Sequence, residues 1–205
     1  MLIEDMVFDS DLIAKIKEGK VVIFVGAGAS SGYPTKLPNF YQLTCKVAKE
    51  YGLEYNKKDS PDKFLGDLEQ EEKYVKRTVC DMLKRRKHNT LHQLIIDLFL
   101  DNPIRIVTTN YDNMLEQCLG KNTTPIYNAP ALPLGGNFEG IVHIHGNVKD
   151  PENIVLTDTD FGLAYINKGY ASRFLIDLFM EYTVLFIGYS YNDTIINKLF
   201  DSCLT

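Results

Sequence analysis

Three apolar segments that lie far apart in the chain each end in small, amide-bearing or basic residues. They cover residues 21–30, 104–112 and 141–146. Their continuous apolar runs are typical of strands that are covered on both faces in a parallel sheet. Because the carboxyl ends of parallel strands line the crevice where ligands bind, the three segments together predict one shared ligand site.

The segments between these runs have helical patterns. We expect a helix over residues 10–18, capped by Ser10 and stopped at Gly19, and apolar side chains recur at helical spacing through much of 39–100. About 60 residues of helix between two strands are too many for one crossover. They predict a small helical subdomain, inserted over about 39–100 beside the sheet.

The second half of the chain continues to alternate strands with helices. The elements expected there are a helix over 112–120, strands over 123–127, 141–145 and 184–190, a helix start at 157–160, a helical face through Phe174 and Leu178, and a last helix capped by Asn192 and Asp193. This alternation predicts an α/β fold, namely a doubly wound, Rossmann-like parallel sheet with an inserted small helical subdomain.

Composition limits the classes of function. The 205 residues carry a formal net charge of −5, which argues against broad nucleic-acid binding. The basic run 84–88 is interpreted as the solvated end of a helix, with a nucleic-acid or partner contact there as the alternative. No segment approaches the roughly 20 apolar residues of a membrane span. Acidic residues stand where a signal peptide would be basic. We therefore expect a cytoplasmic protein that contacts neither a membrane nor nucleic acid directly.

The cysteines are too widely spaced to form a recognisable zinc or redox motif. They are Cys45, Cys80, Cys118 and Cys203. We expect reduced, partly buried thiols and no bound metal.

The loop after the first strand has the composition of a phosphate-binding loop. Gly26 and Gly28 let the backbone approach a pyrophosphate, and the amides from Ala27 to Ser30 could cradle it. The dinucleotide fingerprint of dehydrogenases does not fit, because Gly32 comes one residue late and no strand with a ribose-binding acid follows. A tight turn between strand and loop is the alternative interpretation.

Amide and carboxylate side chains follow the second strand. Asn110 can hold a ribose hydroxyl or a water molecule, since a carboxamide both donates and accepts hydrogen bonds. Asp112 could bind a carboxamide or cap the helix expected after it. For Asn110 the alternative is an ordinary turn residue.

Histidines lie at the end of the strand expected over 141–145. His143 and His145 are spaced to share one face of that strand, but no third metal ligand stands at a recognisable spacing. His145, beside Gly146, is the candidate base, because an unperturbed pKa of roughly 6.5 allows it to accept a proton at neutral pH. We interpret His143 as a core residue, and likewise His88 and His92 as structural.

The strand over 184–190 repeats the pattern for a fourth time. Gly188 and Ser190 flank Tyr189 at its end, and such small residues would let an adenosine lie across the strand tip. Asp193 is interpreted as the cap of the last helix.

Taken together, the four motifs resemble those of the sirtuin family, and specifically the sirtuin-like branch of bacterial antiphage defence. The segment 26–30 is similar to the family's Gly-Ala-Gly-x-Ser loop, and 109–112 to its Thr/Gln-Asn-x-Asp element. His145 and Gly146 match the catalytic His-Gly pair, and 188–190 the late Gly-x-Ser. The motifs occur in family order over nearly the whole chain.

The resemblance implies roles for these residues around NAD. Asn110 would position water or the nicotinamide ribose, His145 would act as the base, and Asp112 would contact the nicotinamide carboxamide. The other residues implied in NAD binding are Gly26, Ala27, Gly28, Ser30, Thr109, Gly188 and Ser190. NAD would be the substrate, and no metal would take part.

One departure from the family favours one of its two activities. Sirtuins that deacylate proteins usually carry a four-cysteine zinc module, which this sequence lacks, whereas the defence branch lacks the module and hydrolyses NAD to nicotinamide and ADP-ribose. The resemblance therefore implies an NAD hydrolase. The alternatives are a zinc-free NAD-dependent deacylase and a non-catalytic module that binds NAD or ADP-ribose as a sensor. Hydrolysis and cyclisation are not separated.

The resemblance also sets expectations for the whole protein. Residues 1–205 would form one NAD-binding catalytic domain, the N-terminal part of a longer protein. A C-terminal domain or a partner protein would regulate it, and relatives of the defence type imply a homo-oligomer.

Overall fold

In a computed structural model of the chain, the central element is a parallel sheet. The structure describes residues 2–3, 6–7, 9–56, 58–71, 73–84, 86–120, 123–133, 137–190, 196, 198–199 and 201. Within these residues five strands pair in parallel in the order β5-β6-β4-β3-β7. Their bounds are β3 (Val21–Val25), β4 (Arg105–Thr108), β5 (Ile126–Asn128), β6 (Gly140–His143) and β7 (Thr183–Ile187). The predicted Rossmann-like α/β class is therefore confirmed.

The register of the sheet brings four strand ends into one row. Val25 of β3 pairs with Thr108 of β4 and with Ile187 of β7, and Thr108 pairs in turn with His143 of β6. The chain runs from β3 to β4 and later β6 on one side, then returns to β7 on the other side of β3. Such a reversal marks the crevice where open α/β sheets bind ligands.

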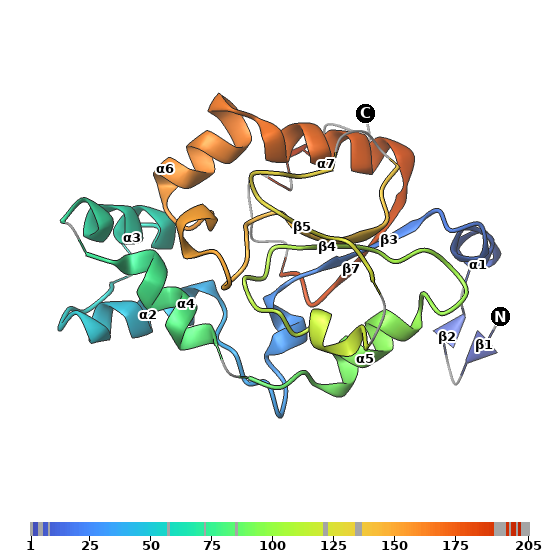
Figure 1. Cartoon of the computed structure of the whole chain (residues 1–205), viewed down its shortest axis with the longest axis horizontal. Coiled ribbons are helices and arrows are strands. Elements are labelled where there is room, and N and C mark those ends of the chain that lie inside the picture. Colours follow the sequence, from blue (N-terminus) through green and yellow to red (C-terminus); the bar gives the residue numbers. More distant parts are fainter. Residues whose placement is uncertain are drawn as a thin grey trace.

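Helices cover both faces of the sheet, as the continuous apolar strands require (Figure 1). Val22 and Phe24 of β3 face the side packed by α7 (Tyr170–Glu181), and Ile23 faces the side packed by α5 (Thr90–Asp97). This alternation is the period of two that a strand imposes on its side chains. Two further helices complete the layers, α1 (Ser10–Lys17) and the short α6 (Asp158–Phe161).

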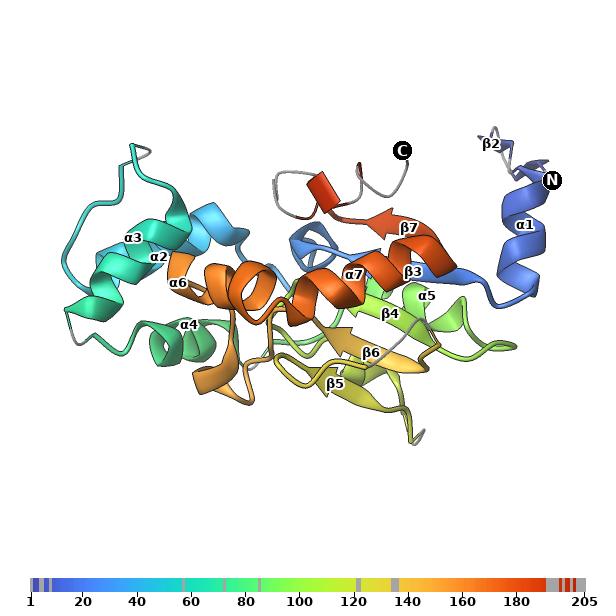
Figure 2. The same ribbon diagram turned by 90° about the horizontal axis from the view of Figure 1, so that it is seen from above.

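The predicted helical subdomain is built from α2 (Phe40–Glu50), α3 (Pro61–Gln70) and α4 (Val75–Leu83). These helices share a core of their own, to which Tyr111, Ile154 and Leu156 from the loops after β4 and β6 contribute. Figures 1 and 2 show them grouped at one end of the molecule, with α1 at the other. The last helix predicted in 39–100, α5, instead packs on the sheet.

A partly buried ion pair joins the subdomain to α6. Nζ of Lys76 lies 2.7 Å from Oδ1 of Asp160, and both side chains are less than one-fifth exposed. The other oxygen of Asp160 accepts hydrogen bonds from the Thr157 hydroxyl and from the Leu156 and Thr157 amides. Thr157 caps α6, so the helix start predicted at 157–160 is confirmed.

Some predicted boundaries were wrong. Asp9, one residue before Ser10, caps α1. The segment 112–120 forms turns and the short 3-10 helix η2 (Glu116–Cys118) instead of a helix over its whole length, because the Cys118 and Leu119 amides bond carbonyl oxygens only three residues back. The caps predicted at Asn192 and Asp193 lie outside the described residues.

The remaining strands form a small antiparallel hairpin apart from the main sheet, with β1 (Leu2–Ile3) paired to β2 (Met6–Val7). Of the helices that the structure describes, none combines the length and the apolar character that a membrane crossing requires.

Candidate active site at the strand ends

Hydrogen bonds join the loops after β3 and β4 into one buried polar cluster. The amide nitrogen Nδ2 of Asn110 donates to the Gly26 carbonyl oxygen at 3.1 Å and lies 3.5 Å from the Ser30 hydroxyl. That hydroxyl donates to Oδ2 of Asp112 at 2.9 Å. Ser30, Asn110 and Asp112 are 1%, 8% and 7% exposed. The structure therefore brings these predicted site residues into direct contact.

The cluster extends to His92, which the sequence analysis interpreted as structural. The backbone amide of Asn89 donates to Nδ1 of His92, so a neutral ring carries its proton on Nε2. Nε2 then donates to the Ser30 hydroxyl across 3.1 Å. Burial, assisted by the nearby His88, lowers the pKa of His92 to about 4, which keeps the ring neutral.

The direction of these bonds decides what Ser30 does. Its hydroxyl donates a hydrogen bond to Asp112 and accepts one from His92. A serine nucleophile would instead donate to the histidine. Ser30 is thus a connecting residue between the glycine loop and Asp112, in spite of its neighbouring histidine and aspartate.

Asp112 is a buried carboxylate with two donors. Burial raises the pKa of Asp112, and the hydrogen bonds from the Met114 amide and the Ser30 hydroxyl partly offset that rise. Its carboxylate therefore caps the turn that follows β4 and also anchors the loop after β3.

The glycines bring the loops after β3 and β7 into backbone contact. The Gly28 amide donates to the Gly188 carbonyl oxygen at 2.8 Å, and the Gly26 amide to the Ile187 oxygen at 2.9 Å. A Cβ on Gly26 or Gly28 would stand 2.7 Å from the Gly188 oxygen, and one on Gly188 would collide with the Ala29 amide nitrogen. Close packing thus accounts for these glycines sterically, which is the tight-turn interpretation.

Other predicted residues remain accessible along the same edge of the sheet. Gly28, Gly188 and Ser190 are exposed, while Ala27 and Thr109 are half-buried. A ligand could meet these residues without any displacement of the buried cluster.

His145 lies just beyond the end of β6 and has an aromatic environment. Its Nε2 is 2.7 Å from the hydroxyl oxygen of Tyr165. The ring of Phe161 packs edge-on against the imidazole, with the two ring centroids 5.1 Å apart. Tyr165 belongs to the π-helical segment η4 (Gly162–Asn167), a type of segment frequent at functional sites. Neither aromatic residue was predicted from sequence, although their spacing of four places them on one helical face.

The prediction that His143 and His145 share one face was wrong. His143 contacts the Asn110 carbonyl oxygen and Glu116, whereas His145 contacts Tyr165. The strand ends at His143, and the chain then turns through Gly146 at a φ of +80°. The alternation of a strand therefore does not extend to His145.

The thiols and acidic side chains that the structure describes give no indication of a metal centre. Cys45, Cys80 and Cys118 are free, and burial raises the pKa of the Cys80 thiol in the subdomain core to about 11. Cys203 lies outside the described residues. Across the described ranges, no three His, Cys, Asp or Glu side chains are grouped as metal ligands would be.

Comparisons with known proteins agree with this arrangement. Residues 104–205 match the family described as a SIR2-like domain, a stretch that contains Asn110, His145 and Gly188. The sirtuin-like class predicted from the four motifs is thereby confirmed. The part of the chain from β4 onward is therefore similar to a SIR2-like domain.

Individual relatives extend the similarity across most of the chain. An uncharacterized protein, y4cA of Sinorhizobium fredii, is 30% identical over 91% of this chain and 18% of its own length. Defense-associated sirtuin 2 of Bacillus subtilis is 27% identical, over 95% of this chain and 21% of its own. The NAD(+) hydrolase ThsA of Bacillus cereus is 25% identical, over 91% of this chain and 40% of its own length. The chain thus spans less than half the length of these curated relatives.

Proposed function

We propose that this domain binds NAD at the carboxyl ends of β3, β4, β6 and β7 and hydrolyses its nicotinamide–ribose bond. The products would be nicotinamide and ADP-ribose. The observation that carries the proposal is the buried cluster of Ser30, Asn110 and Asp112, which lies at the carboxyl ends of β3 and β4, beside the point between β3 and β7 where the strand order changes direction. The names of two relatives, an NAD(+) hydrolase and a defense-associated sirtuin, support the same reaction and a role in antiphage defence.

The proposed reaction needs a positioned water molecule and a base. Asn110 holds the water or the ribose hydroxyls, and Asp112 faces the nicotinamide carboxamide. The C–N bond breaks, and its electron pair leaves with nicotinamide, which is neutral once released because the bound ring is cationic. Water attacks the oxocarbenium-like sugar carbon and loses its proton to His145. Every step uses side chains of this domain, with NAD as the substrate and no metal.

The burial of the proposed site residues supports a regulated activity. Ser30, Asn110, Asp112 and His145 are each 8% exposed or less, and we propose that residues covering them move before NAD binds. We propose that a further domain or a partner protein drives this opening, since the relatives are much longer than this chain. We also propose that the protein forms a homo-oligomer and lies in the cytoplasm.

Two alternatives have different requirements. A zinc-free deacylase would release nicotinamide only with an acylated peptide, and a sensor module would bind NAD or ADP-ribose without turnover. The presence of both a candidate base, His145, and a positioning amide, Asn110, favours catalysis over binding alone.

The experiment is chromatography of NAD incubated with the purified protein, without acylated peptide, beside His145→Ala. We expect nicotinamide and ADP-ribose from the parent protein and neither from the variant. Nicotinamide release that requires an acylated peptide would contradict the proposed hydrolysis. Cyclic ADP-ribose as the main product would show that the reaction is cyclisation of NAD.

A further inference from the structure

A second polar cluster, buried behind the proposed site, contains His143 and Glu116. His143 is fully buried, and the Glu116 side chain is 10% exposed. One ring nitrogen of His143, Nδ1, lies 3.1 Å from the carbonyl oxygen of Asn110. The other, Nε2, lies 3.2 Å from Oε1 of Glu116. The imidazole thus bridges a carboxylate and the backbone of Asn110.

The two neighbours determine the protonation of this ring. Both a carbonyl oxygen and a carboxylate oxygen only accept hydrogen bonds, and a neutral imidazole donates from a single nitrogen. An imidazolium donates from both. Only the charged ring therefore satisfies the contacts to Asn110 and Glu116 at the same time.

Asn147 offers one competing arrangement. Its Nδ2 lies 3.2 Å from Nε2 of His143 and donates to Oε1 of Glu116 at 3.0 Å, so a neutral His143 could accept from it. That arrangement leaves the Glu116 carboxylate without a positively charged hydrogen-bond partner. Its other oxygen, Oε2, is also buried and has no hydrogen-bond partner among the described residues. A buried carboxylate without a neighbouring positive charge is costly.

The electrostatics of the cluster agree with the charged ring. Burial lowers the pKa of His143, but the hydrogen bond and charge of Glu116 outweigh burial, so the pKa is raised. Burial raises the pKa of Glu116, and the hydrogen bond and charge of His143 outweigh it in the opposite direction, so that pKa is lowered. The other charged groups near the pair are Asp112, which favours the imidazolium, and Lys149, which favours the carboxylate.

The backbone of Asn110 is held on both sides. Its amide donates to the Thr108 hydroxyl at 3.0 Å, while its carbonyl oxygen faces His143. The side-chain amide, in turn, donates to Gly26. Because the position of that side chain depends on the backbone that bears it, His143 acts on the proposed site through the Asn110 carbonyl.

We infer that Glu116 and His143 form a buried ion pair whose imidazolium holds the Asn110 carbonyl and so positions the Asn110 side chain for NAD cleavage. Both are positioning residues, and neither touches the substrate. The catalytic part of this inference rests on the proposed function. The ion pair itself does not.

The first test needs neither a variant nor NAD. Nitrogen-15 NMR of the His143 ring is followed as a function of pH in the parent protein. We expect both ring nitrogens to be protonated at pH 7, with titration above the ordinary range near 6.5. A ring protonated at one nitrogen only at pH 7 would overturn the ion pair.

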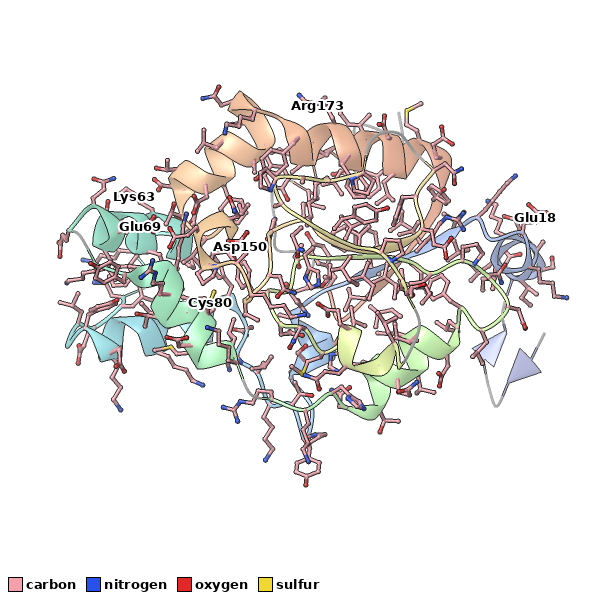
Figure 3. All side chains as sticks on the ribbon, in the orientation of Figure 1. Glu18, Lys63, Glu69, Cys80, Asp150 and Arg173 are labelled. Atoms are coloured by element: carbon pink, nitrogen blue, oxygen red, sulfur yellow. The ribbon has the colours of Figure 1, made fainter. Side chains whose placement is uncertain are left out.

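The second test uses Glu116→Gln, which keeps an acceptor for Nε2 but removes the charge. We expect His143 to become neutral at pH 7, the carbon-13 signal of the Asn110 carbonyl to move, and kcat for NAD to fall by about 10-fold or more with KM nearly unchanged. Glu18→Gln is the matched control, because Glu18 lies at the α1 end of the molecule and its side chain is 58% exposed (Figure 3).

The two tests separate the possible failures. An unchanged Asn110 signal together with a parental kcat in Glu116→Gln would overturn the positioning role. A parent protein that does not hydrolyse NAD would overturn the proposed function. The NMR titration of His143 would then still decide whether the ion pair exists.

Discussion

Nε2 of His145 and the hydroxyl oxygen of Tyr165 lie 2.7 Å apart, and the ring of Phe161 packs against both of these rings. The hydroxyl fixes the orientation of the imidazole, and Phe161 stacks on the Tyr165 ring at 6.0 Å with 19° between the planes. The proposed base is therefore positioned by a residue that lies 20 positions later in the chain.

Tyr165→Phe tests this relationship, because it removes the hydroxyl and keeps both ring contacts. We expect kcat for NAD hydrolysis to fall by about 10-fold, since a misoriented base is less effective, while the free energy of unfolding changes by only about 1 kcal/mol. Tyr74→Phe is the control, because Tyr74 is 73% exposed in the helical subdomain. Equal kcat values for the two variants would show that the hydroxyl plays no part.

Gly188 is the second position with a sharp expectation. It has a φ of +64°, and a Cβ there would collide with the Ala29 amide in the glycine loop. Gly188→Ala should therefore lower the free energy of unfolding by about 3 kcal/mol or more, by adding a collision to the strain of a positive φ. Urea unfolding measures the change.

Gly52→Ala separates these two contributions. Gly52 has a φ of +70° with no heavy atom near its would-be Cβ, so the substitution should cost only about 1 kcal/mol. If both variants lost the same stability, the close contact between the loops after β3 and β7 would be refuted.

The strands and the site region could be predicted from sequence because the signals there are local. The run from Val21 to Val25 reads as a buried strand, and it forms β3 with the predicted bounds. A parallel sheet aligns its strand ends by geometry, which places Ser30, Asn110 and Asp112 together without any knowledge of their contacts.

The residues that support the site have no such local signal. His92 meets Ser30 across 62 positions of sequence, and Glu116 meets His143 across 27. Local periodicity describes one element at a time, so it cannot show which elements meet in the fold. The face of His145 was predicted wrongly for a related reason, since a turn after His143 ended the alternation on which the prediction depended.

Acid stability should depend on His92. Its pKa falls from 6.5 in the unfolded chain to about 4 in the folded one, so the folded state binds fewer protons in this range. Its contribution to stability is therefore present above pH 6.5 and is lost as the pH falls towards 4, which amounts to roughly 3 kcal/mol.

Unfolding by urea at several pH values measures this loss. His92→Gln should flatten the fall in stability between pH 6.5 and 4, although it also weakens the contact to Ser30 at pH 7. His88→Gln, on a half-buried neighbour, removes only the smaller cause of the lowered His92 pKa, so it should keep most of the parental slope. A steep parental slope that persists in His92→Gln would assign the acid sensitivity to other groups.

Asn110 is the predicted residue that joins the glycine loop to the end of β4, and the proposed reaction depends on it most. The most direct measurement is the rate of nicotinamide release from NAD by the parent protein, by Asn110→Ala and by Asn56→Ala, an exposed control in the helical subdomain. We predict that Asn110→Ala is slower by about 100-fold or more while it still binds NAD, and that Asn56→Ala matches the parent. Nicotinamide release by Asn110→Ala at the parental rate would contradict the proposed site.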